Sequence, residues 1–272
     1  MRVYFLGSGS TGNLTVVEAE GARIVLDAGV NPTQAVLRMR QLGADLFDHS
    51  FGTALGIVVS HEHGDHFAQA QPLSRALRAP LYLHGGTVAP ALRRRCEVIG
   101  YEPGSAFTIG PFTIEAMVVP HDAVQVALRV SAGGRAFAMA TDLGHVPPGF
   151  ARFVGEADLA MVEANYCPRM LAEGPYPPSL KRRVGGAHGH LANEQTARLA
   201  SELSRSRLAR LLLGHLSRVN NSPDRAAGVV RERAGRLPVE ALPHGVARVF
   251  DVVAGRPVSG YAPIQLALPF GA

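Results

Sequence analysis

Three histidines and an aspartate, side chains of types that can bind metal ions, stand within six consecutive positions, His61-Glu62-His63-Gly64-Asp65-His66. They follow Gly56-Ile57-Val58-Val59-Ser60, an apolar run whose β-branched residues predict a buried strand. Residues i and i+2 of an extended chain point to the same side, so His61 and His63 are expected to leave the strand end together. Asp65 and His66 follow in the turn and can face a neighbouring point. This set offers more coordination than one tetrahedral ion needs, so the spacing predicts two adjacent metal ions.

The alternative is that these histidines are clustered by chance and bind no metal. The chain contains 11 histidines in 272 residues, and histidines in a surface loop can be merely solvated. A chance cluster, however, would not be placed at the end of a strand. The hypothesis of a metal site therefore depends on finding further ligands at comparable positions.

The pattern of apolar residues predicts one domain of packed sheets flanked by helices. Charged residues make up 18% of the chain and hydrophobic residues 47%, which excludes a disordered protein. Expected strands are 2–6, 14–18, 23–26, 56–60, 81–83, 112–119, 124–130, 135–140, 159–163 and 210–213, and expected helices are 34–42, 68–77, 193–204 and 223–234. Asn193 is a candidate cap for the third helix.

Several features favour a cytoplasmic protein. The N-terminal run Met1 to Leu6 is too short for a signal peptide and reads as the first strand. No apolar run approaches the roughly 20 residues of a membrane span. The two cysteines, Cys96 and Cys167, offer no disulfide framework, which fits a reducing compartment.

Three further candidate ligands follow apolar strands elsewhere in the chain: His121, Asp142 and His215. Strands hold their end residues rigidly while the loops leave room for a substrate. We expect His61, His63 and His121 to hold one ion, and Asp65, His66 and His215 to hold the other. The two carboxylate oxygens of Asp142 suit a ligand that bridges the pair, which would lie roughly 3.5–4 Å apart.

This arrangement of motifs resembles the metallo-β-lactamase superfamily. The resemblance rests on His61-x-His63-x-Asp65-His66, on Leu26-Asp27-Ala28-Gly29 and on Thr141-Asp142-Leu143-Gly144, and it spans nearly the whole chain. It implies a single α/β domain built as a four-layered αββα sandwich, with two divalent metal ions at one rim. It also implies that Asp27 supports a metal-bound imidazole, whose second nitrogen needs a fixed partner.

A narrower resemblance points to the YycJ/VicX-type nuclease branch of that superfamily. It rests on five segments, which are Gly7-Ser8-Gly9-Ser10-Thr11-Gly12-Asn13, Glu163-Ala164-Asn165, Gly174-Pro175-Tyr176-Pro177, Gly189-His190-Leu191-Ala192-Asn193 and Gly214-His215-Leu216-Ser217-x-x-Asn220-Asn221. The chain departs from the branch at Tyr166-Cys167, where the branch tends to carry His-Asp. Cys167 is therefore expected to be structural.

His190 is a separate candidate for the chemistry, together with Asp65. It precedes the helix expected from Asn193, and backbone N–H groups at a helix start favour an anion. The resemblance implies that a histidine at this place contacts the scissile phosphate, so His190 would bind phosphate and protonate the leaving group. The alternative is a loop residue at a helix start. His49, His84, His145, His188 and His244 have no comparable placement and are assigned to the surface or to supporting positions.

The function expected from this reading is that of a phosphodiesterase or nuclease with two Zn²⁺ or Mn²⁺ ions, which would act as a DNA exonuclease in DNA repair or maintenance. A net charge of +5 favours a polyanionic partner. DNA is preferred to RNA because the chain is too short for the large inserted domain of RNA-maturing members. The alternatives are a small-molecule phosphodiesterase, another hydrolase of the same fold, and a non-catalytic nucleic-acid-binding regulator.

The last residues form a separate expectation. The domain is expected to cover residues 1–260, and residues 261–272 a C-terminal tail. Gln265-Leu266-Ala267-Leu268-Pro269-Phe270 resembles the peptide by which bacterial repair proteins dock on the sliding clamp. Leu268 and Phe270 would enter an apolar pocket while Gln265 supplies hydrogen bonds. The alternative is a final strand or a segment packed on the sheet.

Overall fold

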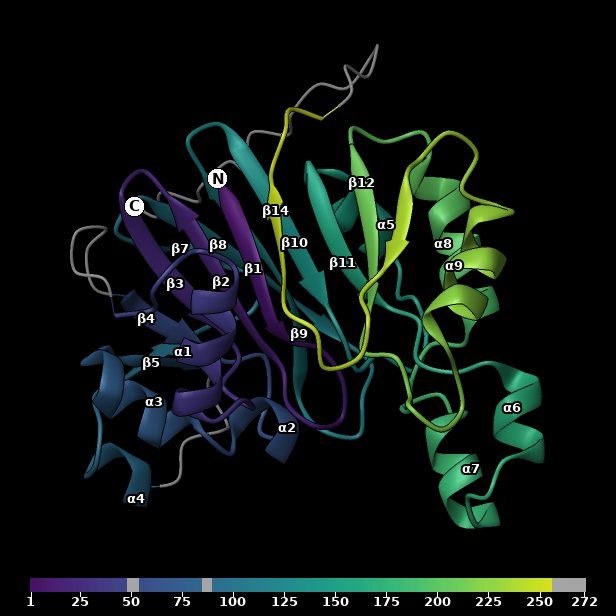
Figure 1. The fold of residues 1–272 in the computed structure, drawn as a ribbon, viewed down its shortest axis with the longest axis horizontal. Coiled ribbons are helices and arrows are strands. Elements are labelled where there is room, and N and C mark those ends of the chain that lie inside the picture. The colour runs from purple at the N-terminus through teal and green to yellow at the C-terminus, as the bar shows by residue number, and fades with distance from the viewer. Residues whose placement is uncertain (48–53, 85–89, 256–272) are drawn as a thin grey trace, which may run out of the picture.

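Two β-sheets packed face to face form the centre of the protein (Figure 1). The computed structural model describes residues 1–47, 54–84 and 90–255. Within these ranges the first sheet has the strand order β14-β1-β2-β3-β4-β5-β6 and the second has the order β13-β12-β11-β10-β9-β8-β7. The first sheet comprises β1 (Arg2–Gly7), β2 (Leu14–Ala19), β3 (Ala22–Leu26), β4 (Ala54–Val58), β5 (Leu81–His84), β6 (Val98–Tyr101) and β14 (Arg248–Asp251). The second comprises β7 (Phe107–Ile109), β8 (Phe112–Val119), β9 (Gln125–Ala132), β10 (Arg135–Ala140), β11 (Leu159–Glu163), β12 (Arg210–Gly214) and β13 (Val239–Ala241).

The core between the sheets is built from large apolar side chains of both inner faces. Phe5 of β1 meets Phe137 of β10 edge to face, with ring centroids 5.7 Å apart, and Phe112 of β8 is fully buried in the same cluster. Every residue of β11 is buried, because helices cover the outer face of this sheet as well. This double coverage explains why its first four residues, Leu159 to Val162, form a continuous apolar run in the sequence.

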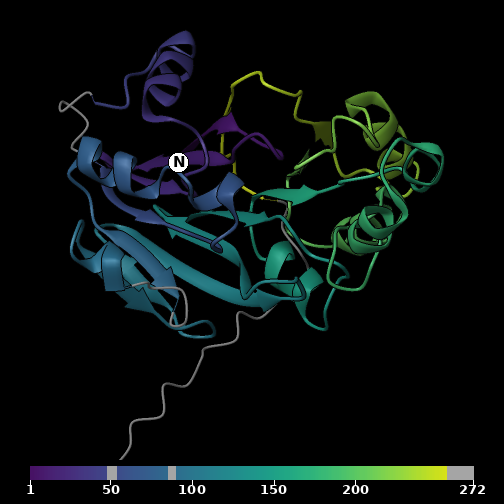
Figure 2. The ribbon, with the colours of Figure 1, turned by 90° about the horizontal axis from the view of Figure 1, so that it is seen from below.

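Helices cover the outer face of each sheet and complete four layers (Figures 1 and 2). Helices α1 (Pro32–Gln41) and α3 (Ala70–Leu77) pack on the first sheet, and α5 (Phe150–Gly155), α8 (Asn193–Leu203) and α9 (Pro223–Arg231) pack on the second. The short helices α2 (Gly64–Phe67) and α4 (Pro90–Arg93) lie at the ends of connections in the first half. The expected αββα sandwich of a single domain is confirmed.

A helical hairpin that the sequence pattern did not predict lies beside the second sheet, at the lower right of Figure 1. It consists of α6 (Pro168–Glu173) and α7 (Pro178–Val184), and we call it the α6–α7 hairpin. Each helix begins with a proline at its first position, where the missing N–H costs nothing. A small apolar cluster that includes Leu171 and Val184 holds the hairpin against the domain.

Several expected boundaries were wrong. Strand β4 ends at Val58, so His61 and His63 lie in the following loop, and Asp65 and His66 lie in α2 rather than in a turn. Helix α8 has Ala192 at its cap: the Ala192 N–H donates to the Gln195 side chain at 2.8 Å, while Asn193 is the first helical residue. The side chain of Asn193 bonds Asn221 instead.

The expected tail, with Gln265, Leu268 and Phe270, lies outside the described residues, and so does His49. Its docking on a sliding clamp stays a prediction. Within the described ranges, no helix combines the length and the apolar character that crossing a membrane requires.

Candidate metal centre

The fold brings the candidate ligands together because strands of both sheets end at one rim. Strands β10, β11 and β12 are adjacent and parallel, with Met139 of β10 opposite Met161 of β11 and Met161 opposite Leu212 of β12. Their carboxyl ends therefore meet at one edge and deliver Asp142, Glu163 and His215 there. The parallel pair β3 and β4 delivers Asp27 and the His61–His66 segment from the other sheet.

The backbone turns sharply where three of these side chains leave their strands. Asp27, Asp142 and His215 have φ values of 62°, 55° and 50°, in the left-handed region. Five non-glycine residues of the described chain have positive φ, and these three are at the candidate site. Such a conformation costs of order 1–3 kcal/mol for each residue and persists where the surrounding structure enforces it. The rim is therefore built to present these three side chains at some cost in stability.

The first ligand set is formed by three imidazoles, from His61, His63 and His121. The distance from His121 Nε2 to His63 Nδ1 is 3.2 Å, and the His61 ring centroid lies 4.7 Å from that of His63. Burial, together with the neighbouring His66, lowers the pKa of His61 to about 2. Burial likewise lowers the pKa of His121. Neutral imidazoles with free lone pairs are the form in which histidine binds a metal.

The second set is formed by Asp65, His66 and His215. His215 Nε2 lies 3.3 Å from Asp65 Oδ2, and His66 Nε2 lies 3.7 Å from the same oxygen. Burial alone would raise the pKa of Asp65, but the His215 hydrogen bond and nearby charge lower it to about 2. The carboxylate is therefore ionised at neutral pH and can serve as an oxygen ligand.

Asp142 lies beside the second set and shares a cluster with His61 of the first. Its Oδ2 is 3.0 Å from His66 Nε2, and its Oδ1 is 3.6 Å from His215 Nδ1. Asp142, His61 and His66 also place one candidate ligand atom each within 4.8 Å of one another. The side chain that the sequence assigned to bridging is thus adjacent to members of both sets.

Two buried atoms of this cluster lack a hydrogen-bond partner within the part of the chain that the structure describes, and this bears on whether a divalent cation fits the site. His61 Nε2 and Asp142 Oδ2 are both inaccessible to solvent and have no hydrogen-bond partner among the described residues. A buried polar atom without a partner is costly, and such atoms are rare in native proteins. Since both are electron-pair donors within one ligand cluster, a bound divalent cation would satisfy them. The residues present therefore fit a metal centre.

Asp27 and Asn13 hold the second set in place. His66 Nδ1 lies 2.7 Å from Asp27 Oδ2, and because a carboxylate only accepts, Nδ1 carries the proton and Nε2 faces the site. The Asn13 amide donates to the Asp65 carbonyl at 3.2 Å and lies 2.8 Å from His66 Nε2. Gly29 permits this packing, because a Cβ there would lie 1.7 Å from the Asp65 carbonyl oxygen.

Replacing Asp27 by asparagine is expected to weaken metal binding by roughly 10–100-fold, the usual cost of losing the partner that orients a ligand. The asparagine amide can donate to His66 Nδ1 and then favours the tautomer whose proton is on Nε2. Titration of chelator-treated protein with Zn²⁺ against a competing indicator would measure the change. Asp45→Asn, in the exposed Arg40 ion pair, is the matched control and should bind metal like the wild type. Equal affinity in the two variants would contradict the role given to Asp27.

His190 faces the same site and is held by Glu163, which the sequence analysis did not single out as a functional residue. His190 Nδ1 lies 3.1 Å from Glu163 Oε2, and His215 Nδ1 lies 3.3 Å from that oxygen. Burial alone would lower the pKa of His190, but the charge and hydrogen bond of Glu163 raise it. The only sequence signal for Glu163 was its place at a strand end in Glu163-Ala164-Asn165.

Asp122 is a second residue that was missed. Its Oδ1 is 3.2 Å from His121 Nε2 and 3.3 Å from His63 Nε2, and its Oδ2 accepts from Arg183 Nε at 2.7 Å. The signal available in the sequence was its position directly after His121 in a strand-end motif. The remaining described histidines lie elsewhere: His145 bonds the Ala187 carbonyl, and His84 is buried against Tyr101.

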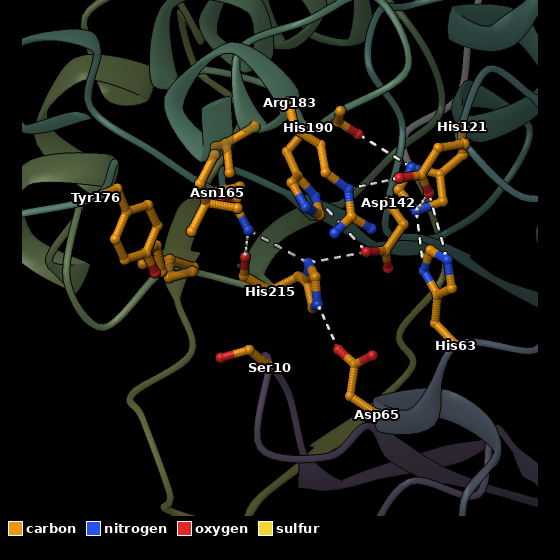
Figure 3. Close-up of a pocket in the computed structure, with 16 residues that line it drawn as sticks. Ser10, His63, Asp65, His121, Asp142, Asn165, Tyr176, Arg183, His190 and His215 are labelled. Carbon is orange, nitrogen blue, oxygen red and sulfur yellow. Dashed lines mark hydrogen bonds and ion pairs between the residues drawn. The ribbon is translucent and has the colours of Figure 1, made fainter. Parts of the chain in front are cut away.

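A pocket of about 200 Å³ opens onto these groups (Figure 3). Candidate ligands and His190 form one side of it, and residues of the α6–α7 hairpin form another. Buried charged groups that converge on a cleft are typical of an active site. The full lining is Ser10, His63, Asp65, His121, Asp122, Asp142, Asn165, Tyr176, Leu180, Arg183, Val184, Gly189, His190, His215, Leu216 and Ser217.

Known proteins are similar to this chain in sequence. Residues 22–215 match the β-lactamase superfamily domain. The chain is 28% identical to exodeoxyribonuclease YycJ of Bacillus anthracis, covering 91% of this chain and 92% of that protein. It is 30% identical to exodeoxyribonuclease WalJ of Streptococcus pneumoniae, covering 79% and 81%.

Solved structures agree on the fold. The metallo-β-lactamase fold protein YhfI from Bacillus subtilis superimposes with a TM-score of 0.68 at 19% identity, covering 92% of this chain and 99% of that one. The short form of human tRNase Z gives a TM-score of 0.65 at 18% identity, covering 93% and 100%. Fold, ligand cluster and sequence agree, and the chain therefore belongs to the β-lactamase superfamily, as a metal-dependent hydrolase of the YycJ type.

Proposed function

We propose that this protein is a phosphodiesterase with two divalent metal ions that digests DNA from its ends and serves DNA repair or maintenance. The observation that carries the proposal is the position of Asp142 beside His66 of one ligand set and in one cluster with His61 of the other, with His190 lining the same pocket. The two relatives named as exodeoxyribonucleases support a DNA substrate. Binding of the C-terminal tail to a sliding clamp remains a further part of this proposal.

The residues that would hold the metal ions are His61, His63 and His121 for one and Asp65, His66 and His215 for the other, with Asp142 between them. Bound there, divalent ions would activate a water molecule and neutralise charge on a phosphate. Imidazoles suit Zn²⁺, whereas the carboxylates and a nuclease role also permit Mn²⁺. Asp65 is placed to orient the attacking water, since its carboxylate is ionised and partly exposed to the pocket.

His190 has the properties of a group that stabilises and protonates the leaving oxygen. Its Nδ1 proton is held by Glu163, so Nε2 is the nitrogen that remains for the substrate. The raised pKa means that the ring carries a positive charge more readily than a free histidine. A cationic imidazole can bind a phosphate oxygen and transfer a proton to the departing one.

Removal of metal provides the first test. Protein treated with a chelator and then dialysed is expected to lose hydrolysis of end-labelled DNA, and added Mn²⁺ or Zn²⁺ should restore it. Single strands, duplex and a chromogenic diester would be compared, with products resolved on a gel so that end trimming is distinguished from internal cuts. Activity that persists after chelation and metal analysis would contradict the proposed centre.

The same assay separates the alternatives. A small-molecule phosphodiesterase would hydrolyse the diester and leave both forms of DNA intact. A non-catalytic regulator would bind DNA without cleaving any substrate, although a full set of candidate ligands in one cluster argues for activity. Cleavage of RNA in preference to DNA would correct the substrate but not the reaction.

A further inference from the structure

The pocket has two chemically different sides. His63, His121 and Asp142 bring imidazole and carboxylate groups to one side, where the phosphodiester would react. Tyr176 and Leu180 of the α6–α7 hairpin region bring apolar surface to the pocket as well. Figure 3 places Tyr176 on the side away from His63 and His121, with Arg183 between them. Such a pocket suits a ligand that combines an anionic centre with a flat apolar part.

Arg183 is positioned to bind an anion. Its Nε donates to Asp122 Oδ2 at 2.7 Å, which fixes the guanidinium at the pocket while 61% of the side chain remains exposed. Arginine carries five N–H donors in a planar fork that matches the geometry of a phosphate. One bond to Asp122 leaves further donors available for a phosphate oxygen.

Tyr176 is positioned to bind a base. Among the described residues that line the pocket, its ring is the only aromatic one besides the histidines. The ring is half-buried and packs against the cluster that holds the hairpin, which limits the orientations it can take. Aromatic side chains of this kind are the usual platforms for the bases of single-stranded nucleic acid.

We propose that Tyr176 and Arg183 form a subsite for the end of a DNA strand, in which Tyr176 stacks on the terminal base and Arg183 binds the phosphate next to it. This inference rests on the proposed function, and it names how the enzyme selects a strand end. Both residues line the same pocket as His190, so a terminal base on the Tyr176 ring and a phosphate on the Arg183 guanidinium would lie beside the candidate centre.

Photo-cross-linking tests the stacking contact without requiring cleavage. Single-stranded oligonucleotides with phosphorothioate end linkages would carry 5-iododeoxyuridine at one position, either terminal or five nucleotides inside, and the cross-linked residue would be mapped by mass spectrometry. The terminal probe is expected to label Tyr176 and the internal probe is not. The proposal would be overturned if the terminal and the internal probe both labelled Tyr176. It would also be overturned if a terminal probe labelled Tyr176 at neither the 5′ nor the 3′ end.

Binding of the same oligonucleotides, followed by fluorescence anisotropy, tests each residue. Tyr176→Ala should raise Kd roughly tenfold through lost stacking, while Tyr176→Phe, which keeps the ring, should bind like the wild type. Arg183→Gln should reduce the slope of log K against log salt concentration by about 0.7, the contribution of one phosphate on a single strand. Arg182→Gln removes the same charge from the neighbouring residue, which does not line the pocket, and should leave the slope unchanged.

Activity measurements separate failure of this subsite from failure of the proposed function. If the wild type cleaves no DNA, the proposed function fails whatever the binding data show. If it does cleave DNA, the ratio of kcat/KM for the oligonucleotide to kcat/KM for the chromogenic diester should fall at least tenfold in Tyr176→Ala. An unchanged ratio, in protein whose Tm matches the wild type, would overturn the subsite alone.

Discussion

Replacing Asp142 by alanine is expected to lower kcat/KM for DNA by roughly 10³-fold or more. One hydrogen-bond donor to a transition state is already worth about 10²–10³ in rate. Asp142 should exceed this because it serves both ligand sets: its Oδ2 lies 3.0 Å from His66 Nε2 of the second set, and it shares a ligand cluster with His61 of the first. The metal content of the purified variant should fall as well.

The fold should survive this substitution. Asp142 Oδ2 accepts no hydrogen bond from the described backbone, so alanine leaves no backbone N–H without an acceptor there. The neighbouring His66 and His215 can remain neutral once the buried charge is removed. Alanine tolerates the left-handed backbone less well than aspartate, so Asp142→Asn is a useful second variant. Asp251→Ala, which deletes an exposed carboxylate in an ion pair with Arg2, is the control and should retain full activity. Wild-type rates in a folded Asp142→Ala protein would remove Asp142 from the centre.

Most strands and candidate ligands could be predicted from the sequence because their signals are local. Strand β8 and β10 were expected with the bounds that the structure gives them, since each is an apolar run ended by a turn. His121 and Asp142 each follow their strand after one intervening residue, so their place at the rim followed from the strand assignment. Parallel neighbours then bring such residues to one edge.

Other elements carry no strong local signal. Strands β6, β7, β13 and β14 have three or four residues each, and their pairing depends on neighbours far along the chain. Helices α6 and α7 have six and seven residues, which is too short for a clear amphipathic period. The pocket wall around Tyr176 and Arg183 could not be foreseen without this hairpin. From the sequence alone, Lys181-Arg182-Arg183 cannot be distinguished from a basic run exposed to solvent.

The role of Glu163 was hidden for a different reason, because its partners are scattered. Its Oε1 accepts from the backbone N–H groups of Leu143 and Leu191 at 2.8 and 2.9 Å, and its Oε2 faces His190 and His215. These four residues lie between 20 and 52 positions away along the chain. Burial alone would raise the pKa of the Glu163 carboxyl, but the charge and hydrogen bonds of the two histidines lower it. Only the folded chain brings one carboxylate to both rings.

Two substitutions at Glu163 are expected to separate its contribution to stability from its contribution to metal binding and activity. Glu163→Ala leaves two buried N–H groups without an acceptor. At about 1–3 kcal/mol each, their loss should reduce the free energy of unfolding by roughly 2–6 kcal/mol. Glu163→Gln keeps the oxygen for those groups and should be close to the wild type in stability. Urea unfolding monitored by circular dichroism would measure both changes.

The glutamine variant should nevertheless lose roughly 10–100-fold in metal affinity and activity, the usual effect of altering the partner of a ligand. Its amide can donate but not accept toward His190 Nδ1 and His215 Nδ1, so both rings would be driven to the tautomer with the proton on Nε2. For His215 this blocks the nitrogen that lies 3.3 Å from Asp65. The exposed Glu202→Gln is the matched control and should change neither quantity. Because Glu163→Gln preserves the backbone contacts, a stable variant with wild-type metal affinity and rate would show that Glu163 serves the fold alone.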